Sequence, residues 1–250
     1  MDNFSTIITL GSRIQYYFYM NYYFIFRQLR LFLKYVIVVF LILSFSGVLT
    51  YRVIPVPFTP LMFQRAFEQV FSHKKVHFQH KWVSIDKISP NMVLAAVAAE
   101  DNNFVNHYGF DFEAIEKAQE HNKRSKRVRG ASTITQQTSK NVYLWISRNY
   151  IRKGLEVYYT FLIETVWSKK RIMEVYLNSI EMGNGIFGVE AASRAYFKKP
   201  ASQLTRGEAA LIAASFPNPL KRNPAAPGNY LINRQQLILS LMNKMEKVNL

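Results

Sequence analysis

The chain has 250 residues, enough for one folded domain with an anchor or for two small domains. Its hydrophobic content of 49% excludes a disordered chain, and the absence of cysteine excludes disulfide frameworks and thiolate metal sites. The formal net charge of +16 predicts an anionic partner, such as nucleic acid, phospholipid head groups or a phosphorylated substrate.

An uncharged apolar run covers residues 35–51, which at 1.5 Å per residue nearly spans a hydrocarbon core. The charges that flank this run are Arg27, Arg30 and Lys34 before it and Arg52 after it. Positive charge on the N-terminal side predicts a cytoplasmic N-terminus and an exported C-terminal bulk. We therefore expect a cytoplasmic leader rich in aromatic and basic residues at 1–30 and a single transmembrane anchor at 31–52. A cleaved signal peptide with a small-residue site near Ser44 is the alternative, although the leader is long for one.

Residues 53–88 are expected to link the anchor to the folded domain and to lie close to the membrane. Three prolines between residues 55 and 60 predict a stiff extended segment, and a helix is expected at 63–71. Three histidines then follow at spacings typical of a metal-binding face: His73, His77 and His80. No carboxylate accompanies them and the neighbouring lysines repel a cation, so a solvated surface is the favoured interpretation.

The folded domain is expected at 89–250 and to be mainly α, with a strand considered only at 82–85. Ser89 caps a helix that has Pro90 at its first position, and its apolar run ends at Glu100. Desolvation and the negative end of the helix dipole would both raise the pKa of the Glu100 carboxyl group, which suits a general base. A carboxylate in open solvent is the alternative for this segment alone.

Basic residues form two clusters in the middle of the domain. The first is a polar stretch interpreted as a mobile loop, either a solvated charge run or a contact for lipid phosphates. It contains Lys123, Arg124, Lys126, Arg127 and Arg129. The second, Lys140, Arg148 and Arg152, has helical spacings of eight and four that predict one cationic stripe for a diphosphate. Arg152 also lies four residues before Glu156, the spacing of an ordinary surface salt bridge.

Amide side chains lie close to the second basic cluster. Thr133 and Gln136 fit a capping box, whereas the adjacent Gln137 and the later Asn141 suit sugar hydroxyls or phosphate oxygens. Farther on, the pattern predicts a helix at 171–180, a glycine-rich turn at 183–188, a capping box opened by Thr205 and a last helix at 230–247.

Five ordered motifs resemble the peptidoglycan glycosyltransferases, glycosyltransferase family 51, from residue 53 to about residue 247. The first two are Glu100-Asp101 with Phe104, His107, Gly109 and Asp111, and residues 130–137 with Lys140 and Asn141. The third is Arg152-Lys153 with Glu156, and the last two cover residues 172–197 and 209–224. The leader before residue 27 lies outside the family pattern, and a proline expected near Trp145 is missing.

The resemblance implies a lysozyme-like helical head, a smaller membrane-abutting jaw subdomain, a cleft between them and one preceding transmembrane helix. It also implies polymerisation of lipid II, in which a GlcNAc 4-hydroxyl attacks C1 of MurNAc, undecaprenyl diphosphate leaves and the linkage inverts from α to β-1,4. By the resemblance Glu100 is the general base, and Lys140 and Arg148 hold the diphosphate. Glu156 orients the site or binds a divalent cation, Mg²⁺ or Mn²⁺, at the diphosphate. The other substrate-binding residues would be Ser132, Gln136, Gln137, Asn141, Arg152, Lys153, Asp101, Phe104 and His107.

The resemblance further implies location in the bacterial inner membrane, with the catalytic domain outside the cytoplasm. The expected partners are lipid II, the growing glycan, the membrane, separate transpeptidases and proteins of division or elongation, and no nucleic acid or organic cofactor is expected. No transpeptidase domain is expected within the chain. Two alternatives are a muramidase with two carboxylates, which leaves Lys140 and Arg148 unexplained, and a non-enzymatic basic membrane protein, for which no nucleic-acid motif is present.

Overall fold

The computed structural model describes residues 3–72, 76–125, 130–147, 149–245, 248 and 250. The chain divides into two units, Met1–Thr50 and Tyr51–Leu250, and each is described by itself. Helix α1 (Asn3–Val53) makes up the described part of the first unit, and its last three residues belong to the second. Its segment Tyr22–Val53 is long and apolar enough to cross a membrane, as the sequence predicts for this region.

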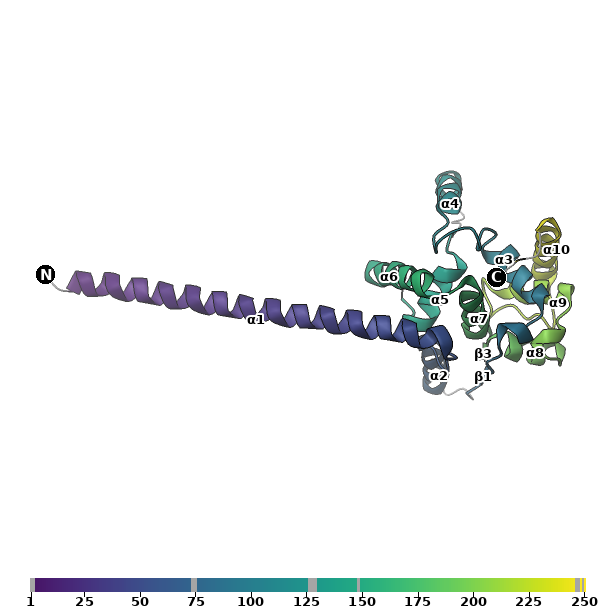
Figure 1. Ribbon diagram of the computed structural model, residues 1–250, viewed down its shortest axis with the longest axis horizontal. Helices are drawn as coiled ribbons and strands as arrows, with labels where there is room; N and C mark the ends of the chain where they lie inside the picture. The colour runs from purple at the N-terminus through teal and green to yellow at the C-terminus, as the bar shows by residue number, and fades with distance from the viewer. Residues whose placement is uncertain (1–2, 73–75, 126–129, 148, 246–247, 249) are drawn as a thin grey trace. The chain divides into compact units, whose positions relative to one another are not determined.

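In the second unit, α3 (Pro90–Glu100), α9 (Arg206–Ser215) and α10 (Asn229–Lys244) pack on one another (Figure 1). Small apolar residues line α3 and α9 on almost every side, so both helices are buried and lie close together. The Ser89 hydroxyl accepts a bond from the Asn91 amide at the start of α3, and Thr205 forms a capping box with Glu208 at the start of α9. These predicted caps are confirmed.

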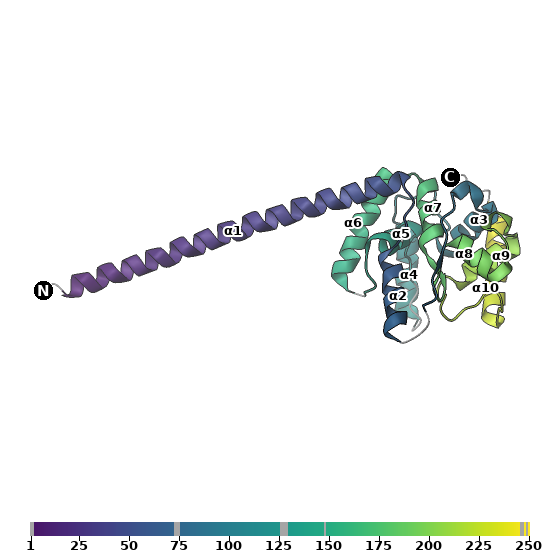
Figure 2. The same cartoon turned by 90° about the horizontal axis from the view of Figure 1, so that it is seen from below.

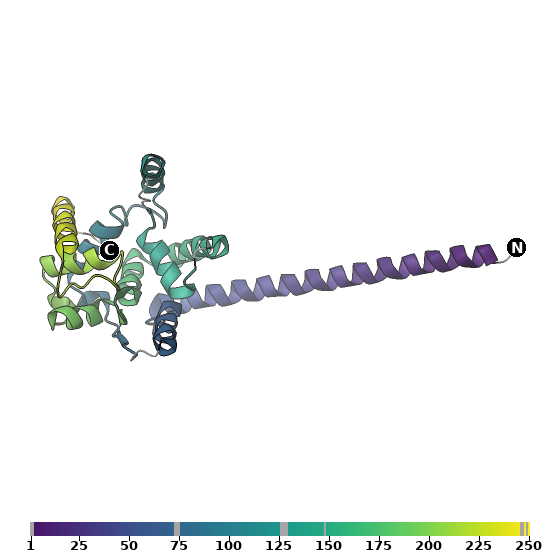
Figure 3. The ribbon, with the colours of Figure 1, turned by 180° about the vertical axis from the view of Figure 1, so that it is seen from behind.

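A second group of helices is centred on α5 (Ile134–Tyr143), which contacts α6 (Tyr150–Val166), α7 (Lys169–Ser179) and α2 (Pro60–Phe71). In the second unit, α7 lies between this group and the group of α3, α9 and α10 (Figure 2). Helix α4 (Phe112–Arg124) projects from the rest of the unit (Figure 3). Thr133 forms the predicted capping box with Gln136 at the start of α5, which fixes the first turn of that helix beside the end of α3.

A small sheet and α8 (Val189–Phe197) complete the unit, with short 3-10 turns at Ile85–Lys87 and Ala201–Gln203. The strand order is β1 (Gln79–His80), β3 (Ile186–Phe187), β2 (Glu181–Gly183), with β1 parallel and β2 antiparallel to β3. The turn between β2 and β3 needs glycine at Gly185, where φ is +70° and a Cβ atom would lie 1.8 Å from the His77 carbonyl oxygen. The strand considered at 82–85 is therefore wrong, because pairing occurs at 79–80.

The described histidines of the predicted metal-binding face, His77 and His80, do not form a metal site. His77 Nδ1 donates to the Asn184 carbonyl at 2.9 Å, and His80 Nε2 donates to the Asn178 carbonyl at 3.0 Å. The His80 ring therefore ties β1, and the His77 ring ties the segment before β1, to neighbouring segments. His73 lies outside the described residues. The mainly α, lysozyme-like fold class is confirmed, and α7 packs into the core through Ile172, Met173, Tyr176 and Leu177.

Candidate active site

Glu100 ends the buried helix α3, and its side chain is only 16% exposed. The Gln137 Nε2 amide donates to Glu100 Oε2 at 2.8 Å, and the Tyr176 hydroxyl donates to Gln137 Oε1 at 3.3 Å. Desolvation raises the pKa of the Glu100 carboxyl group, and the Gln137 bond together with the nearby Arg234 and Lys140 charges opposes that rise. The predicted desolvated carboxyl group at the end of an apolar helix is confirmed.

The basic residues near Glu100 come from two helices. Lys140 lies in the last turn of α5, whereas Arg152 lies in the first turn of α6, and residues 144–147 and 149 between them are not helical. The predicted single-helix stripe is therefore wrong, although both residues line one pocket. Arg148 lies outside the described residues, as do Lys126, Arg127 and Arg129 of the basic stretch.

Glu156 is buried on α6 between two cations. Arg152 Nη1 lies 2.7 Å from Glu156 Oε2, and Lys153 Nζ lies 2.5 Å from Oε1. The Glu156 side chain is 4% exposed, so the pair with Arg152 is an interior ion pair, and the surface salt bridge of the simpler interpretation is wrong. Glu156 fixes Arg152 at the pocket, because a buried carboxylate with both oxygens bound to cations has little freedom to move.

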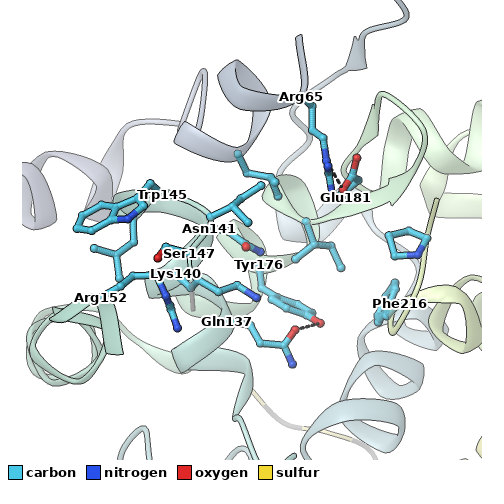
Figure 4. Close-up of a pocket in the computed structure, with 15 residues that line it drawn as sticks. Arg65, Gln137, Lys140, Asn141, Trp145, Ser147, Arg152, Tyr176, Glu181 and Phe216 are labelled. Carbon is cyan, nitrogen blue, oxygen red and sulfur yellow. Dashed lines mark hydrogen bonds and ion pairs between the residues drawn. The ribbon is translucent and has the colours of Figure 1, made fainter. Parts of the chain in front are cut away.

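Lys140 faces the pocket that these helices enclose (Figure 4). The side chain is accessible to solvent, but the pocket walls exclude much of the surrounding water, and this desolvation lowers the pKa of the lysine ammonium. The Glu156 charge opposes the shift, and the Arg152 charge adds to it. A partly desolvated ammonium group interacts more strongly with an incoming anion than a fully hydrated one does.

The pocket has a volume of about 400 Å³. The predicted site residues that line it are Gln137, Lys140, Asn141 and Arg152, and Gln137 connects it to Glu100. Its far wall carries Arg65 and Glu181, whose Nε and Oε2 atoms lie 3.1 Å apart. No local sequence signal indicates this pair, because its members are 116 residues apart.

The remaining described residues of the predicted site do not line that pocket. Ser132 is exposed and lines two cavities that Glu100 also lines. Gln136 is buried, and its side-chain oxygen accepts the Thr133 amide within the capping box. Phe104 is fully buried, with Lys169 Nζ at 4.6 Å from its ring centroid. The roles of these residues and of Lys153 in substrate binding stay predictions.

Comparison with known proteins identifies the family. The family model "Transglycosylase" matches residues 67–243. A biosynthetic peptidoglycan transglycosylase of Bacteroides thetaiotaomicron is 55% identical over 80% of this chain and 81% of the relative. Proteins of the same name from Cronobacter sakazakii and Bdellovibrio bacteriovorus are 53% and 50% identical, over 80% and 86% of this chain and 83% and 86% of their own lengths. The chain belongs to the transglycosylase family.

In this transglycosylase, Asp101 connects the end of α3 to the start of α5. Its Oδ1 atom accepts His107 Nε2 at 2.8 Å, and its Oδ2 atom accepts the Ile134 backbone amide at 2.9 Å. The ligand atoms of Asp101, His107 and Asp111 lie within 4.8 Å of one another. Asp111 Oδ1 already accepts the Ala114 amide as a helix cap, so the described bonds give both carboxylates of this cluster a structural role.

Asp101→Asn is expected to lower the free energy of unfolding by about 1–3 kcal/mol, because an amide in place of the carboxylate leaves one of the two buried donors unpaired. Urea unfolding of the detergent-solubilised chain measures the change. Asp86→Asn is the matched control. It removes the same charge from a side chain that is 74% exposed. Equal stability of the two variants would show that the Asp101 bonds contribute little and would favour a direct role in substrate binding.

Proposed function

We propose that this transglycosylase is a peptidoglycan glycosyltransferase that polymerises lipid II into linear β-1,4 glycan. Glu100 takes the proton of the GlcNAc 4-hydroxyl as the hydroxyl oxygen bonds to C1 of MurNAc. The bond from C1 to the diphosphate breaks on the opposite face, so the configuration inverts and undecaprenyl diphosphate leaves. Gln137 holds Glu100 Oε2, which leaves Oε1 to accept the proton.

The observation that carries this proposal is the connection of a desolvated carboxyl group to a cationic pocket through a single glutamine. Gln137 bonds to Glu100 and lines the pocket that contains Lys140 and Arg152. A diphosphate leaves as an anion, so its departure needs fixed positive charge more than it needs a strong acid. Lys140 and Arg152 supply that charge in a site where the protein restricts water.

Glu156 and Asp101 do not support the muramidase alternative. A muramidase needs a second free carboxyl group across the glycosidic bond from the acid. Both oxygens of Glu156 are bound to cations, and both oxygens of Asp101 accept buried hydrogen bonds. Neither carboxylate is therefore free to act as the second catalytic group. The cationic pocket also has no role in simple glycan hydrolysis.

Glu156 does not fit a divalent cation as its ligand. Arg152 and Lys153 each lie within ion-pair distance of one of its oxygens, and Lys140 is close enough for its charge to interact with Glu156. A metal ion bound there would meet three positive charges at short range. The proposed mechanism therefore places no step on a metal at Glu156, and any divalent ion would enter with the diphosphate.

The proposed site lies close to a membrane, because the substrate carries a lipid. The helix Tyr22–Val53 has the length and composition of a membrane anchor. Helix α2 adds a second feature, since Phe63, Phe67 and Phe71 form a stripe with 66%, 62% and 66% exposure. Phenylalanines spaced by four share one helix face. We assign this stripe to the membrane-abutting jaw. The catalytic unit then lies on the outer side of the inner membrane, outside the cytoplasm.

A lipid-depth measurement tests the assignment of α2. The chain contains no cysteine, so Phe67→Cys gives one labelling site for a fluorophore in the full-length protein in vesicles. Quenching of that fluorophore by nitroxide-labelled lipid is expected to exceed, by severalfold, the quenching at Leu237→Cys on α10, which is 56% exposed in the wild type. Equal quenching at the two positions would place the stripe away from the lipid.

A gel assay with labelled lipid II tests the proposed reaction. The detergent-purified chain is expected to produce glycan ladders that lysozyme digests and that the inhibitor moenomycin prevents. Digestion of preformed glycan with intact lipid II would instead establish a muramidase. Absence of both reactions would leave a binding role. Cross-linking of the product is expected to require separate transpeptidases, because no transpeptidase activity is proposed for this chain.

A further inference from the structure

A second basic cavity lies beside Glu100, on helix α10 and the segment before it. Its volume is about 710 Å³, and its lining includes Glu100, Gln137, Ser132, Arg222, Tyr230 and Arg234. The pocket of Lys140 and Arg152 shares Gln137 with this cavity, but Glu100 lines only the second of the two. The carboxyl group therefore lines the second cavity, which borders the pocket of Lys140 at Gln137.

Both arginines have hydrogen-bond donors without an acceptor in the described structure. Arg222 Nη1 and Arg234 Nε are buried and unpaired. The Arg222 guanidinium lies 4.0 Å from the Tyr230 ring centroid, which holds its plane, and Arg234 Nη2 lies 4.0 Å from Glu100 Oε1, too far for a hydrogen bond. Buried donors in native proteins normally have partners, so these two groups indicate an acceptor that the described part of the chain does not supply.

We propose that Arg222 and Arg234 bind an oxyanion of the attacking substrate. This inference rests on the proposed function and extends it to the second substrate. A general base must lie within hydrogen-bond reach of the proton that it removes, so the attacking sugar must enter a cavity that Glu100 lines. The cations in that cavity therefore meet the attacking substrate, while Lys140 and Arg152 meet the leaving diphosphate.

A third cavity next to Glu100 is less suitable for an anion. Its volume is about 420 Å³, and its charged lining consists of four carboxylates and one lysine: Glu100, Asp101, Asp111, Glu113 and Lys117. An anionic substrate would be repelled there and attracted by the arginines of the second cavity. The charges thus select the side of Glu100 from which the attacking hydroxyl arrives.

The oxyanion has two sources on a lipid-linked, peptide-bearing sugar. It is either the diphosphate of the attacking molecule or a carboxylate of its peptide, and the planar guanidinium group binds both in the same way. The site is therefore defined by its chemistry. Acceptor substrates that carry or lack the peptide decide which of the two oxyanions the arginines bind.

The test measures acceptor kinetics in the full-length protein. The acceptor KM is measured by varying a short-chain lipid II analogue against a saturating donor, a short glycan that still carries its lipid diphosphate. The donor KM is measured by varying that glycan against a saturating acceptor. Arg222→Gln and Arg234→Gln are each expected to raise the acceptor KM about tenfold or more while the donor KM stays unchanged, since each removes a charge-assisted hydrogen bond. Lys221→Gln removes the same charge from an adjacent exposed position and is expected to change neither constant.

Arg222→Gln tests the proposal more directly than Arg234→Gln does. Arg234 also interacts with the Glu100 charge, whereas Arg222 is not among the groups that shift the Glu100 pKa. A KM effect that persists with the peptide-free acceptor identifies the diphosphate as the bound group, and one that disappears identifies the peptide carboxylate. The inference is overturned by an unchanged acceptor KM in the Arg222 variant, or by a fall in kcat alone. Failure of the proposed function is distinct, because the wild type would then not polymerise.

Discussion

Glu100→Gln is expected to reduce polymerisation by about a hundredfold to ten-thousandfold, the usual contribution of a general base. The amide keeps the size and hydrogen-bonding capacity of the side chain but cannot accept the proton of the attacking hydroxyl. Binding of lipid II is expected to persist, because Lys140 and Arg152 are untouched. Single-turnover rates and equilibrium binding to the labelled substrate measure the two effects separately.

The pH dependence of the wild type provides a second measure of the same group. Burial raises the Glu100 pKa, and the base works only in its ionised form, so activity is expected to fall on acidification at a higher pH than the usual carboxyl value of 4.5 would give. This acidic limb reports the free enzyme when kcat/KM is plotted. Its absence from the residual activity of Glu100→Gln would assign it to Glu100.

Stability supplies the control for folding of this variant. A carboxyl group whose pKa is raised on folding holds its proton more tightly in the native state, so stability falls as pH rises above the unfolded pKa. At neutral pH the charged Glu100 therefore opposes folding, and Glu100→Gln is expected to raise the melting temperature. Loss of activity with a lowered melting temperature would indicate misfolding, and wild-type activity with intact folding would refute Glu100 as the base.

The sequence predicts those features of the site that have local causes. A capped apolar run places Glu100 at the end of a buried helix, and the Thr133 capping box places Gln137 in the first turns of α5. Both signals lie within a few residues of the group that they position. The mainly helical fold follows in the same way from caps and periodicity along the chain.

The sequence could not predict features that depend on distant contacts. The spacing of Lys140 and Arg152 indicated one helix, but α5 ends at Tyr143 and Asn149 caps a new helix by accepting the Arg152 amide. Strand β1 pairs with β3, whose residues lie more than a hundred positions later, so no local alternation marks it. Arg234 likewise reaches Glu100 only because α10 packs on α3.

Lys140→Gln is expected to reduce kcat/KM by about a hundredfold to a thousandfold, because it removes a fixed cation aimed at the charge that develops on the leaving diphosphate. The loss should appear in kcat as well as in KM, since that charge is greatest as the bond to C1 breaks. Steady-state kinetics on lipid II measure both constants. Lys244→Gln, at the exposed end of α10, is the matched control and is expected to behave as the wild type.

The lowered pKa of Lys140 gives this prediction a pH signature. Desolvation favours the neutral amine, so activity is expected to decline on the alkaline side at a lower pH than the usual lysine value of 10.5 would give. Lys140→Arg keeps the charge at all accessible pH values, and its residual activity is therefore expected to lack that alkaline limb. An alkaline limb that is identical in the wild type and the arginine variant would mean that another group titrates, and Lys140 would then lose its role as the titrating cation of the site.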